Sequence, residues 1–192
     1  VFWSTGNGDF EEDSNWERPL VPDSGQAANF DELNAYTVTL DNPNTARLIV
    51  ERGTVTFDGS TYMASAGSVE NPSVVIGNTA VDSATLRAFV GNVSSNFTTL
   101  GLGSLSSGTL EITGTTQWAD GGDFVIGGAG TGRVTLDAET NLTVNDLILG
   151  QSSGASGTLD IDGDDSSDPD LLNVIGETNE VLKTLGNLKF KN

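Results

Sequence analysis

Apolar and polar positions follow one phrase that recurs five times along the chain. In each copy a short aliphatic segment ends in Ile or Leu followed by Gly, and nine residues later comes a Leu preceded by Thr. Successive glycines lie 24, 26, 23 and 26 residues apart. A constant internal distance with a variable linker is typical of stacked coils, because neighbouring coils hold the body while corner loops absorb insertions. The five pairs are Gly77–Leu86, Gly101–Leu110, Gly127–Leu136, Gly150–Leu159 and Gly176–Leu185.

Alternation with a period of two residues predicts short β-strands in every coil. The segment 36–40 alternates clearly, and 46–50 and 54–57 follow it. Each regular coil is expected to hold a first strand that ends at the repeat Gly, a second strand centred on the repeat Leu, and a weaker third strand, as in 116–118 and 141–144. We therefore predict an all-β fold, a single-stranded parallel β-helix (β-solenoid) with coils of about 23–26 residues. Strand twist favours the right-handed form.

The first 35 residues differ from the rest because aromatic residues are dense there and prolines interrupt any regular element. We interpret residues 1–35 as an N-terminal aromatic cap that covers the apolar end of the first coil. Residues 36–192 form the predicted solenoid, with irregular coils at 36–73 and regular coils at 74–192. The alternative for the aromatic residues is a glycan-stacking site, for which the candidates are Trp3, Trp16 and, in a later coil, Trp118.

The amino-acid composition limits the range of expected binding partners. The chain of 192 residues carries 27 acidic and 8 basic residues, so its net charge is −19. Nucleic acid and anionic membranes are therefore excluded as expected partners, and no stretch approaches the roughly 20 apolar residues of a membrane span. The absence of Cys and His removes thiol chemistry, the commonest general base and the usual zinc ligand. An acidic, Cys-free chain rich in Gly, Ser and Thr favours a secreted bacterial protein.

The densest acidic segment, 160–170, has oxygen ligands at the spacing of a calcium loop. Asp160, Asp162, Asp164 and Asp168 fall at positions 1, 3, 5 and 9 of such a loop. Two features depart from the pattern, since Gly163 stands too early and Leu171 replaces the expected glutamate. The alternatives are a calcium site and an acidic corner loop. No other cofactor is indicated.

A second acidic pattern follows the repeat Leu. Arg87, Glu111, Asp137 and Asp160 come directly after it in four successive coils, so the three carboxylates are expected on adjacent rungs about 5 Å apart. Like charges at that distance are destabilising. Four explanations for how this repulsion is tolerated remain open: splayed side chains in solvent, the charge of Arg87, a bridging cation, or a catalytic role.

Two features indicate an assembly interface. The residues before the last aliphatic of the first strand form a mostly β-branched stripe, which either lies under a corner loop or contacts another chain. Basic residues gather near residue 190, whereas the N-terminal segment is acidic, so head-to-tail attraction between copies is expected. The interface candidates are Val75, Val125, Ile148, Val174, Lys183, Lys189 and Lys191.

The opening of the chain resembles that of secreted bacterial β-solenoid proteins. The residues that carry the resemblance are Trp3, Gly8-Asp9-Phe10, Asn15-Trp16, Pro22, Ala28-Asn29-Phe30, Tyr36-Thr-Val-Thr-Leu40 and the later Gly108-Thr-Leu-Glu-Ile112. Those secreted β-solenoid proteins are similar to autotransporter passenger repeats and to large surface proteins of environmental bacteria. The resemblance implies the fold and is nearly silent on activity, because adhesins, matrix proteins and polysaccharide-degrading enzymes all share this architecture.

We therefore expect an extracellular structural β-solenoid, a subunit or module of a bacterial surface, matrix or filament assembly with adhesive capacity and no enzymatic activity. Its expected partners are copies of itself or adjoining solenoid segments, with glycans as a further option. The first alternative is a carbohydrate-binding or adhesion module. The second is a pectin-lyase-like carbohydrate-active enzyme, in which Glu111, Asp137 and Asp160 supply an acid pair and Arg87 or Arg133 holds the substrate.

Overall fold

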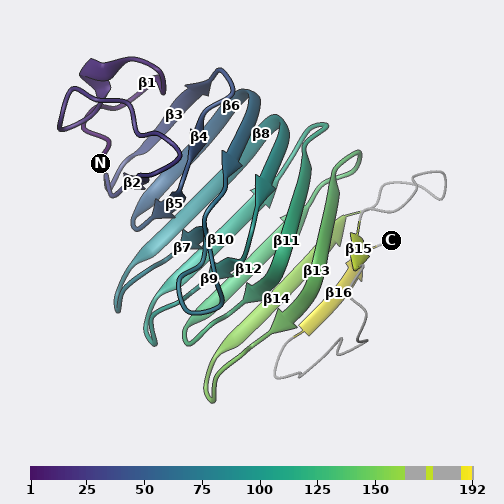
Figure 1. Ribbon diagram of the computed structural model, residues 1–192. Coiled ribbons are helices and arrows are strands. Elements are labelled where there is room, and N and C mark those ends of the chain that lie inside the picture. Colours follow the sequence, from purple (N-terminus) through teal and green to yellow (C-terminus); the bar gives the residue numbers. More distant parts are fainter. Residues whose placement is uncertain (163–171, 175–186, 192) are drawn as a thin grey trace.

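The chain is all-β, with a parallel sheet that curls into a half-barrel compatible with a β-solenoid (Figure 1). The computed structural model describes residues 1–162, 172–174 and 187–191. Within these residues every paired strand is parallel to its neighbours, and the only helical element is a 3₁₀ turn at Asp13–Asn15. The described residues contain no helix long and apolar enough to cross a membrane.

The strands form three parallel ladders. The first ladder contains β1 (Gly8–Asp9), β3 (Ala35–Leu40), β6 (Gly53–Ala64), β8 (Ser83–Ser95), β10 (Ser107–Ile112), β12 (Thr131–Leu136), β14 (Ser156–Asp162) and β16 (Asn187–Lys191). The second contains β4 (Asn44–Thr45), the later parts of β6 and β8, the first halves of β11 (Gln117–Ile126) and β13 (Asn141–Leu149), and β15 (Leu172–Val174).

The third ladder contains β2 (Ala27–Phe30), β5 (Arg47–Val50), β7 (Val74–Ile76), β9 (Thr98–Leu100) and the second halves of β11 and β13. Along the chain each coil passes from the third ladder through a corner to the first, then to the second and back to the third. The three strands that the sequence predicts for a regular coil are therefore confirmed for the first four coils, whereas the fifth repeat, Gly176–Leu185, lies outside the described residues.

Alternating burial in the first ladder explains why these segments are strands. In β10 the side chains of Leu110 and Ile112 are fully buried, whereas Thr109 and Glu111 between them are partly exposed. The first two repeat leucines stack in register, since Leu110 lies beside Leu86 of the preceding coil. Because a lone coil cannot bury its apolar face, each inward column gains its buried area from the coils above and below.

The third regular coil keeps the nine-residue phrase but is out of step by two residues. Leu110 lies beside Val134, and Leu136 lies beside Ile112. The expectation that Leu136 stands level with Leu110 is therefore wrong. The corner after Gly127 is two residues shorter than its neighbours, and a shift of two preserves the alternation of inward and outward side chains.

A column of glycines marks the true register. Gly108, Gly132 and Gly157 are aligned across β10, β12 and β14. A Cβ on Gly132 would lie 2.2 Å from the Gly127 nitrogen, and a Cβ on Gly157 would lie 2.1 Å from the Ile126 oxygen. Only glycine permits this close approach between the first ladder and the end of the third.

Aromatic side chains fill the N-terminal end of the stack. Trp3 and Trp16 meet edge to face with ring centroids 5.0 Å apart, and Phe30 lies 5.7 Å from each of them. These rings continue into the core through Phe57. Within residues 1–35, β1 already pairs with β3 and β2 with β5, so ladder strands begin before the predicted boundary at residue 35.

Candidate functional site

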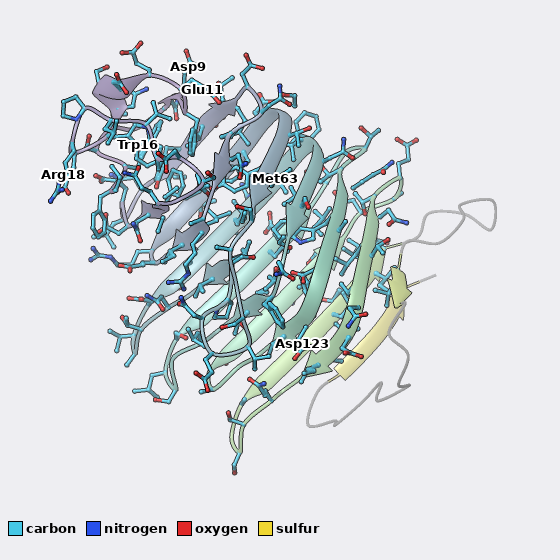
Figure 2. The ribbon with its side chains drawn as sticks, in the orientation of Figure 1. Asp9, Glu11, Trp16, Arg18, Met63 and Asp123 are labelled. Carbon is cyan, nitrogen blue, oxygen red and sulfur yellow. The ribbon has the colours of Figure 1, made fainter. Side chains whose placement is uncertain are left out.

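The three tryptophans proposed for glycan stacking all lie in the interior. Trp3, Trp16 and Trp118 are 1%, 2% and 1% exposed. Their indole nitrogens donate hydrogen bonds to the Gly6 carbonyl, the Phe10 carbonyl and the Ser95 hydroxyl, respectively. Figure 2 shows Trp16 inside the N-terminal segment. The glycan-stacking assignment of these residues is wrong, because a sugar ring cannot reach a buried indole face.

The β-branched stripe of the third ladder is largely covered. Val75 is fully buried and Val125 is 4% exposed, so their assignment to an exposed interface is wrong for the described chain. Thr99 lies between these two valines in the ladder. Gly128, in the corner of the following coil, approaches it so closely that an added Cβ would lie 2.9 Å from the Thr99 methyl carbon. Corner residues therefore pack against the stripe. Ile148 is partly exposed.

For three of the remaining interface candidates the structure gives the strand register, and the fourth lies outside the described residues. Val174 lies in β15 beside Val144 of the second ladder, so its expected place in the stripe with Val75 and Val125 is wrong. The pairing of β16 with β14 sets Lys189 beside Asp160 and Lys191 beside Asp162. Lys183 lies outside the described residues. The predicted electrostatic attraction between copies stays a prediction.

Outward carboxylates on the first ladder are interleaved with hydroxyl and basic residues. Register places Thr135 between Glu111 and Asp160, so the expected stack of Glu111, Asp137 and Asp160 is wrong. Arg87 Nε lies 2.6 Å from Glu111 Oε2, and Arg133 Nη2 lies 2.5 Å from Asp160 Oδ2. The two-residue register shift in β12 is what brings Arg133 within reach of Asp160. Each arginine neutralises a carboxylate of an adjacent coil, although such exposed pairs stabilise a fold by less than about 1 kcal/mol.

Hydroxyl side chains fill most of the other outward positions on this face. Columns of outward residues run across β8, β10, β12 and β14, and we call this surface the hydroxyl face. Its Ser and Thr members are Ser83, Thr85, Ser107, Thr109, Thr131, Thr135, Ser156 and Thr158. Such side chains suit an exposed strand surface, and adjacent pairs of them are favourable.

The proposed calcium ligands lie only partly within the described residues. Asp160 is paired with Arg133, Asp162 is exposed, and Asp164 and Asp168 lie outside the described residues. Residues 1–162, 172–174 and 187–191 contain no group of three or more acidic residues arranged to hold a metal ion. A calcium ion at Asp160 would have to compete with the Arg133 guanidinium for the carboxylate.

Acidic residues also meet at two places where the ladders bend. Asp137, Glu139 and Asp162 line an open hollow of about 440 Å³, together with Gly114 and Ala138. Burial, followed by the charges of Asp162 and Glu111, raises the pKa of Asp137. At the other place Asp123 lies directly beside Asp146 in the ladder between β11 and β13, and burial raises its pKa, with contributions from Asp146 and Asp120.

One carboxylate lies deep inside the curled sheet. Asp120 points inward between β8 and β13 and is only 2% exposed. Its Oδ2 accepts hydrogen bonds from the Ser95 and Thr98 hydroxyls, and its Oδ1 accepts them from the Phe97 and Gly122 backbone nitrogens. The sequence signal was its inward phase in a strand, two residues after Trp118. With four donors the carboxylate is fully satisfied, so its role is structural.

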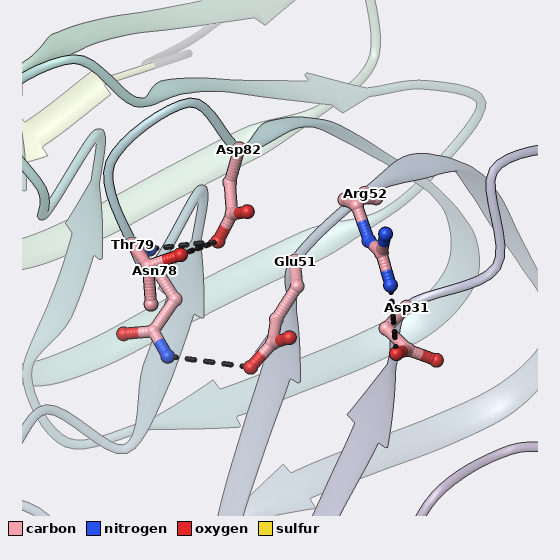
Figure 3. A network of polar contacts seen from close by, with 6 residues as sticks. All are labelled: Asp31, Glu51, Arg52, Asn78, Thr79 and Asp82. Carbon is pink, nitrogen blue, oxygen red and sulfur yellow. Dashed lines mark hydrogen bonds and ion pairs between the residues drawn. The ribbon is translucent and has the colours of Figure 1, made fainter.

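A further set of polar contacts follows the carboxyl ends of the third-ladder strands (Figure 3). Arg52 Nη2 lies 3.0 Å from Asp31 Oδ2, and Asn78 Nδ2 donates to Glu51 Oε1 at 3.4 Å. Asp82 Oδ2 accepts bonds from both the backbone nitrogen and the hydroxyl of Thr79. These contacts fix the corners between coils.

Comparison with known proteins adds no relative. No family model matches the chain, and neither the curated proteins nor the solved structures contain a significant match.

Proposed function

We propose that the chain is an extracellular structural β-solenoid of the right-handed type, a module of a bacterial surface, matrix or filament assembly that joins to further copies of itself. The supporting observation is the difference between the ends of the ladders. One end is filled by buried aromatic rings, whereas β16 pairs only with β14, and β15 only with β13, among the described residues. A strand with an unpaired edge offers its main-chain donors and acceptors to another strand.

Residues exposed along the stack also support this role over an enzymatic one. The carboxylates of Glu111 and Asp160, which the enzyme alternative needs as an acid pair, are each paired with an arginine. The same arginines are the candidate substrate clamps of that alternative. Absence of catalysis and extracellular location remain predictions of this proposal.

Sedimentation velocity and electron microscopy at rising concentration test the proposal, with millimolar calcium and again after chelation. Oligomers or fibres that grow with concentration are expected, and their loss after chelation would assign calcium to the contact. Discrete monomeric rods under every condition would contradict self-association.

A pair of proline variants locates the contact. Consecutive N–H groups of a strand point to opposite edges, so of Leu188→Pro and Lys189→Pro one removes a donor directed at β14 and the other a donor from the opposite edge of β16. The variant that loses the donor on the edge opposite β14 is expected to abolish association without lowering the melting temperature of the monomer. Equal association of both variants and the parent protein would exclude the β16 edge.

A further inference from the structure

An exposed phenylalanine stands where the first ladder bends into the second. Phe89 is 55% exposed, although it lies in the middle of β8 between the buried residues Ala88 and Val90. Its ring rests on Gly114 of the next coil, since a Cβ at Gly114 would be 2.5 Å from Phe89 Cε2. One side of the ring is therefore fixed against the backbone, and the ring does not need a partner to be held in place.

Phe89 also lines a hollow of about 240 Å³. At this level β8 runs unbroken from Ser83 to Ser95, whereas the next coil is divided into β10 and β11 by residues 113–116, which supply Thr115 to the hollow. Its wall and floor combine a carboxylate, a hydroxyl and exposed glycine backbone. The lining residues are Asp58, Gly59, Phe89, Val90, Gly91 and Thr115.

From this arrangement we propose that the Phe89 hollow binds a single pyranose unit of a neutral glycan. A sugar ring has an apolar face that packs on an aromatic ring and a hydroxyl rim that needs hydrogen-bonding groups beside it. Phe89 supplies the apolar platform, and Asp58 accepts hydrogen bonds from the sugar hydroxyls. Register places Asp58 directly beside Phe89 on the neighbouring strand. The net charge of −19 disfavours uronic-acid and sulfated glycans.

The small lining residues matter for access. Gly59 has a φ of 139°, a conformation that side chains rarely adopt, and Gly91 lies beside the Ser60 carbonyl, 2.9 Å from where a Cβ would stand. Glycine at both positions permits the close approach of the preceding strand's backbone and adds no side chain to the lining of the hollow. The site is independent of the buried tryptophans and of the β16 edge, so it is separable from self-association.

Binding is tested on the whole chain by isothermal titration calorimetry with neutral hexasaccharides of glucose, mannose and galactose. At least one of them is expected to bind. Phe89→Ala is expected to weaken binding about tenfold or more, the range of one lost aromatic contact. Phe89→Tyr keeps the platform and is expected to bind like the parent, and Asp58→Asn is expected to weaken binding severalfold.

Leu105→Ala is the matched control, because Leu105 is 73% exposed and lies at a different corner. No binding by the parent protein to any of the three probes, or equal binding by Phe89→Ala and Leu105→Ala, would overturn the proposal. Sedimentation of the same variants keeps the two hypotheses apart: Phe89→Ala is expected to associate like the parent, whatever its affinity for glycan.

Discussion

The hydroxyl of Thr98 donates a 2.5 Å hydrogen bond to the buried carboxylate of Asp120 in the neighbouring coil. Ser95 donates to the same oxygen at 2.7 Å and also accepts a bond from the Trp118 indole. The corner at residues 95–98 is thereby tied to the coil that follows it. This contact is buried inside the curled sheet, where water does not compete with it.

Replacement of Asp120 by Asn is expected to lower the free energy of unfolding by about 2–3 kcal/mol. The amide would direct its own N–H groups at groups that are already donors, and at least one buried donor would lose its acceptor. Thr98→Val, which removes a single donor, is expected to cost about 1 kcal/mol. Urea unfolding followed by circular dichroism measures both, and equal stability of Asp120→Asn and the parent would contradict a structural role for the network.

Gly132→Ala is expected to destabilise the fold by about 3 kcal/mol or prevent folding, because the added methyl carbon would lie 2.2 Å from the Gly127 backbone nitrogen. Gly6→Ala is the control, since no atom lies within 4 Å of the added carbon. Thermal unfolding of the two variants decides the matter. A harmless Gly132→Ala would mean that β12 does not hold the register described above.

Tyr36→Phe is expected to leave stability unchanged or to raise it by up to about 1 kcal/mol. The Tyr36 hydroxyl is the one buried side-chain polar atom without a hydrogen-bond partner among residues 1–162, and burial raises its pKa. Tyr62→Phe is the opposite case, because the Tyr62 hydroxyl lies 2.8 Å from the Thr45 hydroxyl and its removal deletes a buried hydrogen bond. A loss of stability in Tyr36→Phe as large as that in Tyr62→Phe would reveal an unseen partner.

Asp123→Asn is expected to stabilise the protein at pH 7 by less than about 1 kcal/mol. Burial raises the pKa of Asp123 in the folded state, so ionisation of this group opposes folding at pH values above its folded pKa. As the pH falls through that value toward the unfolded pKa of about 3.9, the proton restores the stability and the advantage of the variant disappears. Thermal unfolding at pH 7 and pH 4 measures the difference.

The exposed Glu70→Gln serves as the control for Asp123→Asn. It is expected to change the melting temperature little at either pH. The interpretation fails if Asp123→Asn lowers stability at pH 7 or keeps a constant advantage down to pH 4.

The chain's own repeats determined the all-β architecture and the strands of each coil. The alternation at Leu110 and Ile112 predicts which side chains face inward, and the spacing of the glycines predicts where each coil ends. Both features depend only on local backbone geometry. The acidic composition likewise fixes the sign of the surface charge. None of these properties depends on the register between neighbouring coils.

Only the tertiary structure decided the contacts between coils. The phrase ending at Leu136 has the same internal spacing as the one ending at Leu110, yet a corner two residues shorter brings Val134 beside Leu110 and Arg133 within reach of Asp160. Sequence spacing measures distance along the chain, whereas register depends on how the corner closes. The burial of Trp118 and the exposure of Phe89 were hidden for the same reason, since strand phase and the path of the neighbouring coil decide which side chain is covered.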